Sequence, residues 1–160
     1  MSSSDELLAA VRAAATLELT RHERAQRITD LLRSATGRRW VGVYEVTPTE
    51  VVNLAWSGPA PPAHPRFPAE QGLTGTAISS RETVVSNDVA RDPRYLTALA
   101  STGSELIVPV IVCDRVVGTL DVEDERTEAF SDDDRRLFER VAGEIAALYD
   151  DEGAGESLVR

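Results

Sequence analysis

Residues 104 to 123 read SELIVPVIVCDRVVGTLDVE. Two runs rich in β-branched residues, Glu105 to Val112 and Arg115 to Glu123, lie on either side of the dipeptide Cys113-Asp114. β-branched side chains pack well on a pleated sheet, and two-residue connections commonly join antiparallel strands. The stretch therefore predicts an antiparallel hairpin, and its apolar character places that hairpin at the centre of a sheet.

Further strand signals lie upstream of this hairpin. Apolar and aromatic residues alternate with a period of two from Trp40 to Val46 and from Val52 to Trp56, which predicts a second hairpin. Residues 57–68 hold five of the eight prolines. This segment is predicted to be a loop or an edge strand, where a missing backbone N–H costs little. Thr83 to Ser86 is predicted to be a short strand.

Helices are expected before, between and after these strands. Apolar residues recur at helical spacing in residues 7–15 and again in residues 28–35, and Thr20-Arg-His-Glu23 has the form of a capping box between them. Gly72 begins a short helix, and Ser131 caps a last helix with one apolar stripe. This order predicts an α+β fold, with a central antiparallel sheet, the N- and C-terminal helices on one face and a loop-covered pocket on the other.

The length and composition fit one folded domain. The chain has 160 residues, of which 42% are hydrophobic and 28% are charged, values typical of globular proteins. We expect residues 1–150 to form a single domain, with residues 1–19 as an N-terminal helix and residues 20–150 as the core. Residues 151–160 are expected to form a flexible tail.

Charge and residue usage narrow the classes of function. Seventeen basic and 27 acidic residues give a net charge of −10, which disfavours nucleic acid and anionic membranes as partners. No membrane-spanning run or signal peptide is visible, so a cytoplasmic location is expected. One cysteine and two histidines predict no disulfide framework and no metal site. The chain has no lysine, so Gly72 and Gly75 are interpreted as turn glycines rather than a phosphate cradle, and no cofactor is expected.

Four motifs occur together in the order typical of one family. They are Gly72-Leu-Thr-Gly-Thr-Ala77, Ser86-Asn-Asp-Val89, Ser104-Glu-Leu-Ile-Val-Pro109 and Val117-Gly-Thr-Leu-Asp121. Through them, residues 20–150 resemble the GAF domain family. Within this family the chain is most similar to the free methionine-(R)-sulfoxide reductases, whose W-V-G-x-Y and S-E-[IL]-x-V-P strands match Trp40 to Tyr44 and Ser104 to Pro109.

The resemblance implies a pocket in which an aromatic pair and several carboxylates hold a free amino acid. The matching residues are Trp40, Tyr44, Glu105, Asp121 and Glu123, the last standing where the family has an aspartate. The residues support this independently, because Asp121 and Glu123 lie two apart on one strand face and can jointly receive an ammonium group. The alternative interpretation is structural, with Trp40 and Tyr44 as core aromatics and the carboxylates as exposed strand ends.

The cysteines of these reductases do not carry over. Counting along the chain places the three thiols of the family at His64, Thr74 and Ala98. Sulfoxide reduction through a sulfenic acid needs a nucleophilic thiolate and usually a second thiol to resolve it. Cys113, at the predicted hairpin tip, is interpreted as a bystander, so no catalytic residue is assigned. His64 and Thr74 are instead predicted to contact the ligand.

These observations predict a sensory or regulatory domain that binds a small amino-acid-like or amine-bearing ligand without redox catalysis. Two alternatives stay open: a divergent reductase that uses Cys113 or an external thiol, and an interaction domain with a vestigial pocket. A cyclic nucleotide is disfavoured, although Asn87, Phe130 and Asp133 partly match the GAF domains that bind one. The apolar stripes of the terminal helices are compatible with a homodimer and equally with packing on the sheet.

Overall fold

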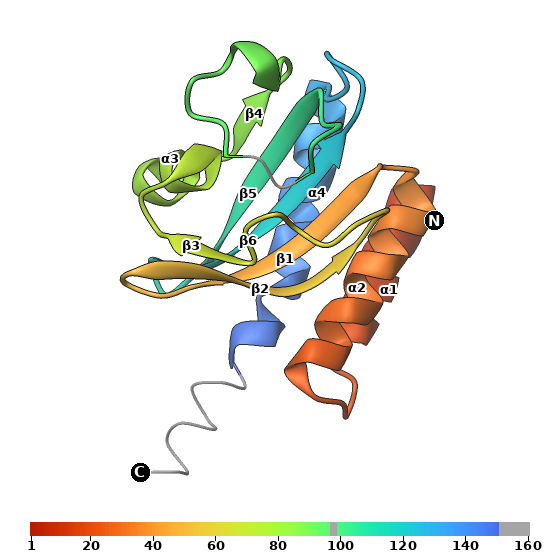
Figure 1. The fold of residues 1–160 in the computed structure, drawn as a ribbon. Helices are drawn as coiled ribbons and strands as arrows, with labels where there is room; N and C mark the ends of the chain where they lie inside the picture. Colours follow the sequence, from red (N-terminus) through yellow and green to blue (C-terminus); the bar gives the residue numbers. More distant parts are fainter. Residues whose placement is uncertain (97–98, 151–160) are drawn as a thin grey trace.

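The computed structural model describes residues 1–96 and 99–150 (Figure 1). Within these residues, one antiparallel sheet has the strand order β3-β2-β1-β6-β5-β4. The strands are β1 (Trp40–Val46), β2 (Glu50–Ser57), β3 (Arg66–Pro68), β4 (Val84–Ser86), β5 (Ser104–Val112) and β6 (Arg115–Asp124). The predicted central hairpin is confirmed, because β5 and β6 pair through the turn at Cys113 and Asp114 and β6 lies beside β1 in the middle of the sheet.

Helices cover one face of this sheet. They are α1 (Ser3–Ala15), α2 (Arg21–Thr36) and α4 (Asp132–Ile145). Figure 1 shows α4 behind β5 and β6, while α2 packs on β1 and β2 and α1 lies against both α2 and α4. The short helix α3 (Gly72–Ser80) packs instead beside β5 and β4. None of the helices in the described part of the chain is long and apolar enough to cross a membrane.

Side-chain caps explain where the three long helices begin. Ser2, Thr20 and Ser131 each form a capping box with the residue three positions later. At the predicted box, the Thr20 hydroxyl accepts from the Glu23 amide at 3.2 Å and the Glu23 carboxylate accepts from the Thr20 amide at 2.9 Å. These contacts satisfy amides that the first turn of a helix leaves without partners. The predicted boundary between the first two helices is thereby confirmed.

The sheet separates a large apolar layer on one face from two smaller ones on the other face. The larger layer lies under α1, α2 and α4 and includes Val43, Leu106, Leu120 and Val122 from the central strands. The smaller layers, on the other face, contain an aromatic group around Tyr44 and an aliphatic group that joins α3 to β5. Because successive side chains of a strand point to opposite faces, the central strands contribute to both. The predicted arrangement of helices on one face and loops on the other is confirmed.

The register of β2 interrupts the alternation predicted from Val52 to Trp56. Against β1, the pairing skips Leu54, which lies between the paired residues Asn53 and Ala55. Leu54 and Ala55 are consecutive, yet both contribute to the helix-side layer. A bulge has this effect because its extra residue has no partner on the neighbouring strand and bends the bulged strand.

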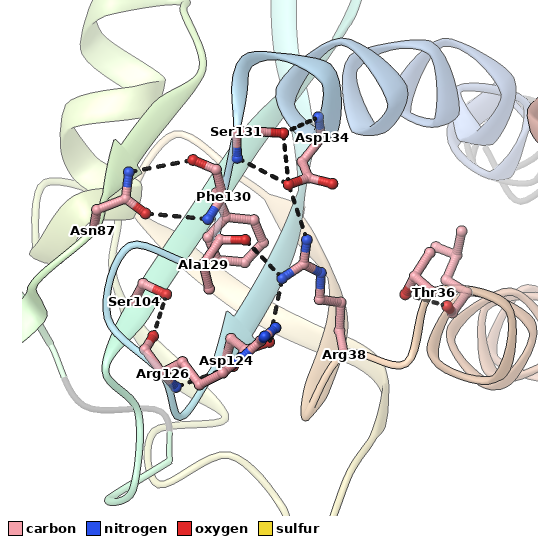
Figure 2. Close-up of polar contacts among 11 residues, drawn as sticks. Thr36, Arg38, Asn87, Ser104, Asp124, Arg126, Ala129, Phe130, Ser131 and Asp134 are labelled. Atoms are coloured by element: carbon pink, nitrogen blue, oxygen red, sulfur yellow. Dashed lines mark hydrogen bonds and ion pairs between the residues drawn. The ribbon is translucent and has the colours of Figure 1, made fainter.

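An ion-pair network at one end of the sheet joins the segment before β1 to β6 and α4 (Figure 2). The Arg38 guanidinium, which is largely buried, donates to Asp124 at 3.2 Å and to the Ala129 carbonyl at 2.9 Å. The same guanidinium lies 3.1 Å from Asp134 and 4.5 Å from the centroid of the Phe130 ring. The network therefore ties the start of α4 to the central strands.

Asn87 binds the backbone of the segment that precedes α4 at this end of the domain. Its side-chain amide donates to the Phe130 carbonyl at 3.3 Å and accepts from the Phe130 amide at 3.2 Å (Figure 2). Asp133 forms a surface ion pair with Arg136. The first two residues of the partial cyclic-nucleotide match thus make framework contacts.

Candidate ligand-binding site

A small cavity lies on the face of the sheet opposite the terminal helices. Its volume is about 20 Å³, which is room for about one water molecule. Strands β1, β3, β5 and β6, helix α3 and two loops supply its lining, which consists of Tyr44, His64, Phe67, Gly72, Leu73, Thr74, Leu96, Glu105 and Asp121. A ligand of amino-acid size therefore requires the lining to move apart.

The structure brings most of the predicted ligand-binding residues together. Five of them line the cavity: Tyr44, His64, Thr74, Glu105 and Asp121. Trp40 and Glu123 are not part of the lining but lie next to it. Trp40 packs beside Tyr44, and Glu123 stands directly across from Glu105 on the neighbouring strand.

Sequence reasoning missed the apolar part of the lining. Phe67 comes from the edge strand β3, and its ring meets Tyr44 edge-on with 6.0 Å between the ring centroids. The sequence offered one signal for this role, namely that Phe67 is the single aromatic residue in the proline-rich segment 57–68. Leu96 lies in a loop, where no periodicity shows which side chains point inward. Only its place in the folded chain reveals it.

Trp40 is fully buried and closely surrounded by backbone. A Cβ atom added at Gly42 or at Gly58 would lie only 2.3 Å from the indole ring. The indole N–H donates to the Ala60 carbonyl at 3.1 Å, and the Trp40 and Tyr44 rings are 6.5 Å apart between centroids. In this state Trp40 holds Tyr44 in place and does not itself face the cavity.

Three carboxyl groups share the pocket face of β5 and β6. Glu105 pairs directly with Glu123, and Asp121 precedes Glu123 by two residues on the same face. Side chains in these relative positions have Cβ atoms within about 5 to 8 Å of one another. The exposed fractions of Glu105, Asp121 and Glu123 are only 4%, 3% and 0%. The alternative interpretation of these residues as exposed strand ends is therefore wrong.

Burial determines the electrostatics of these carboxyl groups. It raises the pKa of Asp121 to about 8 and the pKa of Glu123 to about 7. The pKa of Glu105 is raised well above its ordinary value, first by burial and then by the negative charges of Glu123 and Asp121. Low dielectric and like charges both disfavour ionisation, so the cluster favours its protonated form.

Each of the three groups has an oxygen atom that lacks a hydrogen-bond partner among the described residues. These atoms are Glu105 Oε2, Asp121 Oδ1 and Glu123 Oε2. The Tyr95 hydroxyl donates to the other oxygen of Glu123 at 3.1 Å. A buried oxygen without a partner is costly. The cluster is therefore suited to a group that brings several N–H donors, as an ammonium does.

The positions aligned with the thiols of the resembled family differ in setting. His64 is exposed in the loop before β3, whereas Thr74 is buried in α3, and both line the cavity. Ala98 lies outside the described residues. Cys113 is exposed at the β5–β6 turn and is not among the residues that line the cavity.

Backbone geometry favours glycine at both Gly72 and Gly75, but only Gly72, at the start of α3, fits the prediction of a turn glycine, because Gly75 lies within the helix. Gly72 has a φ of +72°, and a Cβ atom at Gly75 would lie 2.3 Å from the carbonyl oxygen of Glu70. A side chain is unfavourable at either position, because one lies in the left-handed region and the other touches the preceding loop. Within the described residues, no group of three or more His, Cys, Asp or Glu side chains is arranged to hold a metal ion.

The antiparallel sheet, with helices on one face and a loop-covered polar pocket on the other, defines an α+β domain of a small-molecule-binding class. The GAF domain family matches residues 18–149, and the chain belongs to this family. The family predicted from the sequence motifs is thereby confirmed.

Individual relatives support the narrower resemblance. GAF domain-containing protein A of Dictyostelium discoideum is 27% identical over 115 residues, which are 71% of this chain and 72% of that protein. The free methionine-R-sulfoxide reductase of Escherichia coli (strain K12) is 24% identical over 120 residues, 75% of this chain and 67% of that protein. The solved structure of free methionine-R-sulfoxide reductase from Neisseria meningitidis in complex with its substrate superposes with a TM-score of 0.85 at 25% identity, covering 95% and 91% of the two chains. The chain is thus a GAF domain homologous to these reductases.

Proposed function

We propose that this GAF domain is a sensory or regulatory module that binds a small amino-acid-like or amine-bearing ligand and does not reduce it. The observation that carries the proposal is the cluster of Glu105, Asp121 and Glu123. It places at the pocket buried carboxyl oxygens that have no hydrogen-bond partner among residues 1–96 and 99–150. Burying carboxyl oxygens without partners costs free energy. An ammonium group offsets this cost, because it matches both the charge and the lone pairs of the carboxylates.

The rest of the pocket supports an amphipathic ligand. Tyr44, Phe67 and Leu96 offer an apolar wall next to the carboxyl groups Glu105 and Asp121. An ammonium at the acidic end and a hydrophobic or thioether side chain against the wall would use both surfaces. Small free amino acids and simple primary amines have this chemistry.

A link between the pocket and the C-terminal helical segment supports a sensory role. Tyr149 lies just after α4 and is buried. Its hydroxyl donates to the Tyr44 carbonyl at 2.5 Å. Tyr149 also lies over Gly118, where a Cβ atom would come within 2.0 Å of the hydroxyl oxygen. A ligand that displaces Tyr44 would therefore act on the hydrogen bond that holds Tyr149 and the helical segment 147–150 against β1. The cytoplasmic location and the homodimer stay predictions.

A thermal-shift screen tests the proposal. Primary amines and amino acids are expected to raise the melting temperature, because a ligand that binds the native state stabilises it, whereas cyclic nucleotides and amine-free analogues are expected not to. Asp121→Asn is expected to abolish the ligand-induced shift, measured from the baseline of that variant. The exposed substitution Glu82→Gln serves as the matched control and is expected to keep the shift. Failure of every amine to raise the melting temperature would refute the proposal.

Reduction of free methionine-(R)-sulfoxide is the second candidate, because the Neisseria meningitidis enzyme shares 25% identity and a TM-score of 0.85 with this chain. Against it stands the position of Cys113, exposed at the β5–β6 turn, where the pocket lining does not include it. A thioredoxin-coupled assay on the wild-type protein and on Cys113→Ser separates the two functions. Turnover that depends on Cys113 would establish the reductase.

A further inference from the structure

The carboxyl cluster has a property that ammonium binding alone does not require. We propose that Glu105, Asp121 and Glu123 share protons when the pocket is empty, and that an ammonium ligand binds in exchange for them. This inference rests on the proposed ammonium site. In the exchange, the protonated carboxyl groups and the ligand cation give the complex of carboxylates and ammonium, and the displaced protons enter the solvent.

The strand register makes sharing of protons necessary. Glu105 and Glu123 are directly opposed on β5 and β6, and Asp121 is the next residue on the same face. All three are almost completely buried, so water does not screen their mutual repulsion. Opposed carboxyl groups that cannot both ionise hold a proton between them and titrate as a unit.

The ionisable side chains that the structure describes around the carboxyl cluster do not supply a free positive charge to it. Asp92 acts on Glu105 as a further negative charge, and its own carboxylate is 2.7 Å from the Arg94 guanidinium. The phenols of Tyr44 on β1 and Tyr95 in the loop stay protonated, because burial and the neighbouring acids raise both pKa values.

On the remaining sides, the cavity is walled by α3 and by the loop before β3. Helix α3 contributes the uncharged residues Gly72, Leu73 and Thr74, and the loop contributes His64, whose imidazole is exposed at the rim. Among the described residues at the pocket, the protons on the carboxyl groups are therefore what neutralises the cluster before the ligand arrives.

The arrival of an ammonium reverses this balance. A positive charge placed among the three carboxyl groups favours their ionised form and displaces their protons. The unpartnered oxygens Glu105 Oε2, Asp121 Oδ1 and Glu123 Oε2 then accept from the N–H groups of the ligand. For each proton released, the affinity rises about tenfold per pH unit over the range in which the cluster is protonated. The pocket would thus report ligand and pH together.

Isothermal titration calorimetry at pH 7 measures the exchange directly. L-methionine and L-methionine-(R)-sulfoxide are titrated in buffers of different ionisation enthalpy, with 4-(methylthio)butanoate as the analogue that lacks the amine. Release of at least about 0.5 proton per bound amine is expected, together with tighter binding at higher pH. Binding of either amino acid with no proton released, or with proton uptake, would overturn the exchange. Absence of binding by both amino acids would count against the proposed ammonium site instead.

A ligand-free measurement decides the inference even in that case. Infrared spectra of the empty protein at about neutral pH are expected to show a protonated carboxyl band that Glu123→Gln and Asp121→Asn each diminish. Glu82→Gln, at an exposed position, is expected to leave this band unchanged. If the wild-type protein shows no protonated carboxyl at neutral pH, the cluster is ionised when empty and the inference is wrong. Circular dichroism of each variant confirms that it is folded.

Discussion

Replacing Asp121 by asparagine is expected to stabilise the empty protein, and to do so only at higher pH. The pKa of Asp121 is raised from 3.8 to about 8 by burial, so the folded state binds this proton more tightly than the unfolded state does. Below about pH 4 the group is protonated in both states and contributes nothing. Between pH 4 and pH 8, Asp121 ionises in the unfolded state but stays protonated in the folded state, and this ionisation lowers the free energy of the unfolded state. The free energy of unfolding therefore falls over this range.

The pKa difference sets the magnitude. Four pKa units at ~1.4 kcal/mol each give a ceiling of ~6 kcal/mol for the cost of keeping Asp121 in the pocket at high pH. Glu105 and Glu123 lie on the same face and carry part of this electrostatic cost, so the single substitution removes only a share. We expect Asp121→Asn to raise the free energy of unfolding by ~3 kcal/mol at pH 8 and by less than ~0.5 kcal/mol at pH 4.

Urea unfolding of the wild-type protein, Asp121→Asn and the exposed control Glu82→Gln at several pH values provides the assay. The wild-type free energy of unfolding should decline by up to ~1.4 kcal/mol per pH unit for each retained proton, and that of Asp121→Asn should decline less steeply. Two parallel curves, or a variant that is less stable than wild type at pH 8, would refute the reasoning. Glu82→Gln should follow the wild-type curve at every pH.

Three further substitutions test the packing around the site. Gly42→Ala places a Cβ atom 2.3 Å from the Trp40 ring, so we expect a loss of ~2 kcal/mol in urea unfolding; a loss below ~0.5 kcal/mol would mean that the ring is not held there. Tyr149→Phe removes the hydroxyl that donates to the Tyr44 carbonyl, so stability should fall by ~1 kcal/mol and the hydrogen-exchange rate of residues 147–150 should rise, unless the contact is absent in solution. Arg38→Met removes the partner of two carboxylates, and we expect a loss of ~3 kcal/mol by thermal melting, whereas an unchanged melting temperature would contradict the network of Figure 2.

The small volume of the cavity affects how ligand-binding data should be interpreted. At about 20 Å³ it holds roughly one water molecule, so this structure represents a state in which the side chains fill the pocket themselves. A ligand must displace part of the lining, and the free energy of that opening reduces the apparent affinity. Weak shifts with small amines are therefore compatible with a specific site, and the Asp121→Asn comparison identifies which of them come from the pocket.

The shared face of Asp121 and Glu123 was accessible from the sequence because strand geometry is local. Asp121 and Glu123 lie two residues apart on a predicted strand, and such residues share a face whatever the rest of the chain does. The hairpin turn at Cys113 and Asp114 pairs Val112 with Arg115. A register shift further along the ladder, between Val110 and Ile111, then moves the pairing by one residue, so that Glu105 stands opposite Glu123 and not Val122. Strand alternation was sufficient for the first step, whereas the irregularity that brings Glu105 into this register appears only in the folded chain.

The burial of the carboxyl groups and the identity of their neighbours could be learned only from the folded chain. The sequence left open whether Glu105 and Asp121 end their strands in water, and only the loops and α3 that cover this face make them buried and raise their pKa values. Phe67 reaches Tyr44 through the pairing of β3 with β2, and the bulge at Leu54 changes which side chains of β2 face that group. These contacts join segments far apart in the chain, so no local periodicity encodes them. By itself, the sequence determined the central strands, the helix caps at Thr20 and Ser131, the family and the shared face of Asp121 and Glu123. The tertiary structure alone decided that this face is enclosed, because enclosure depends on what packs against a strand and not on the strand itself.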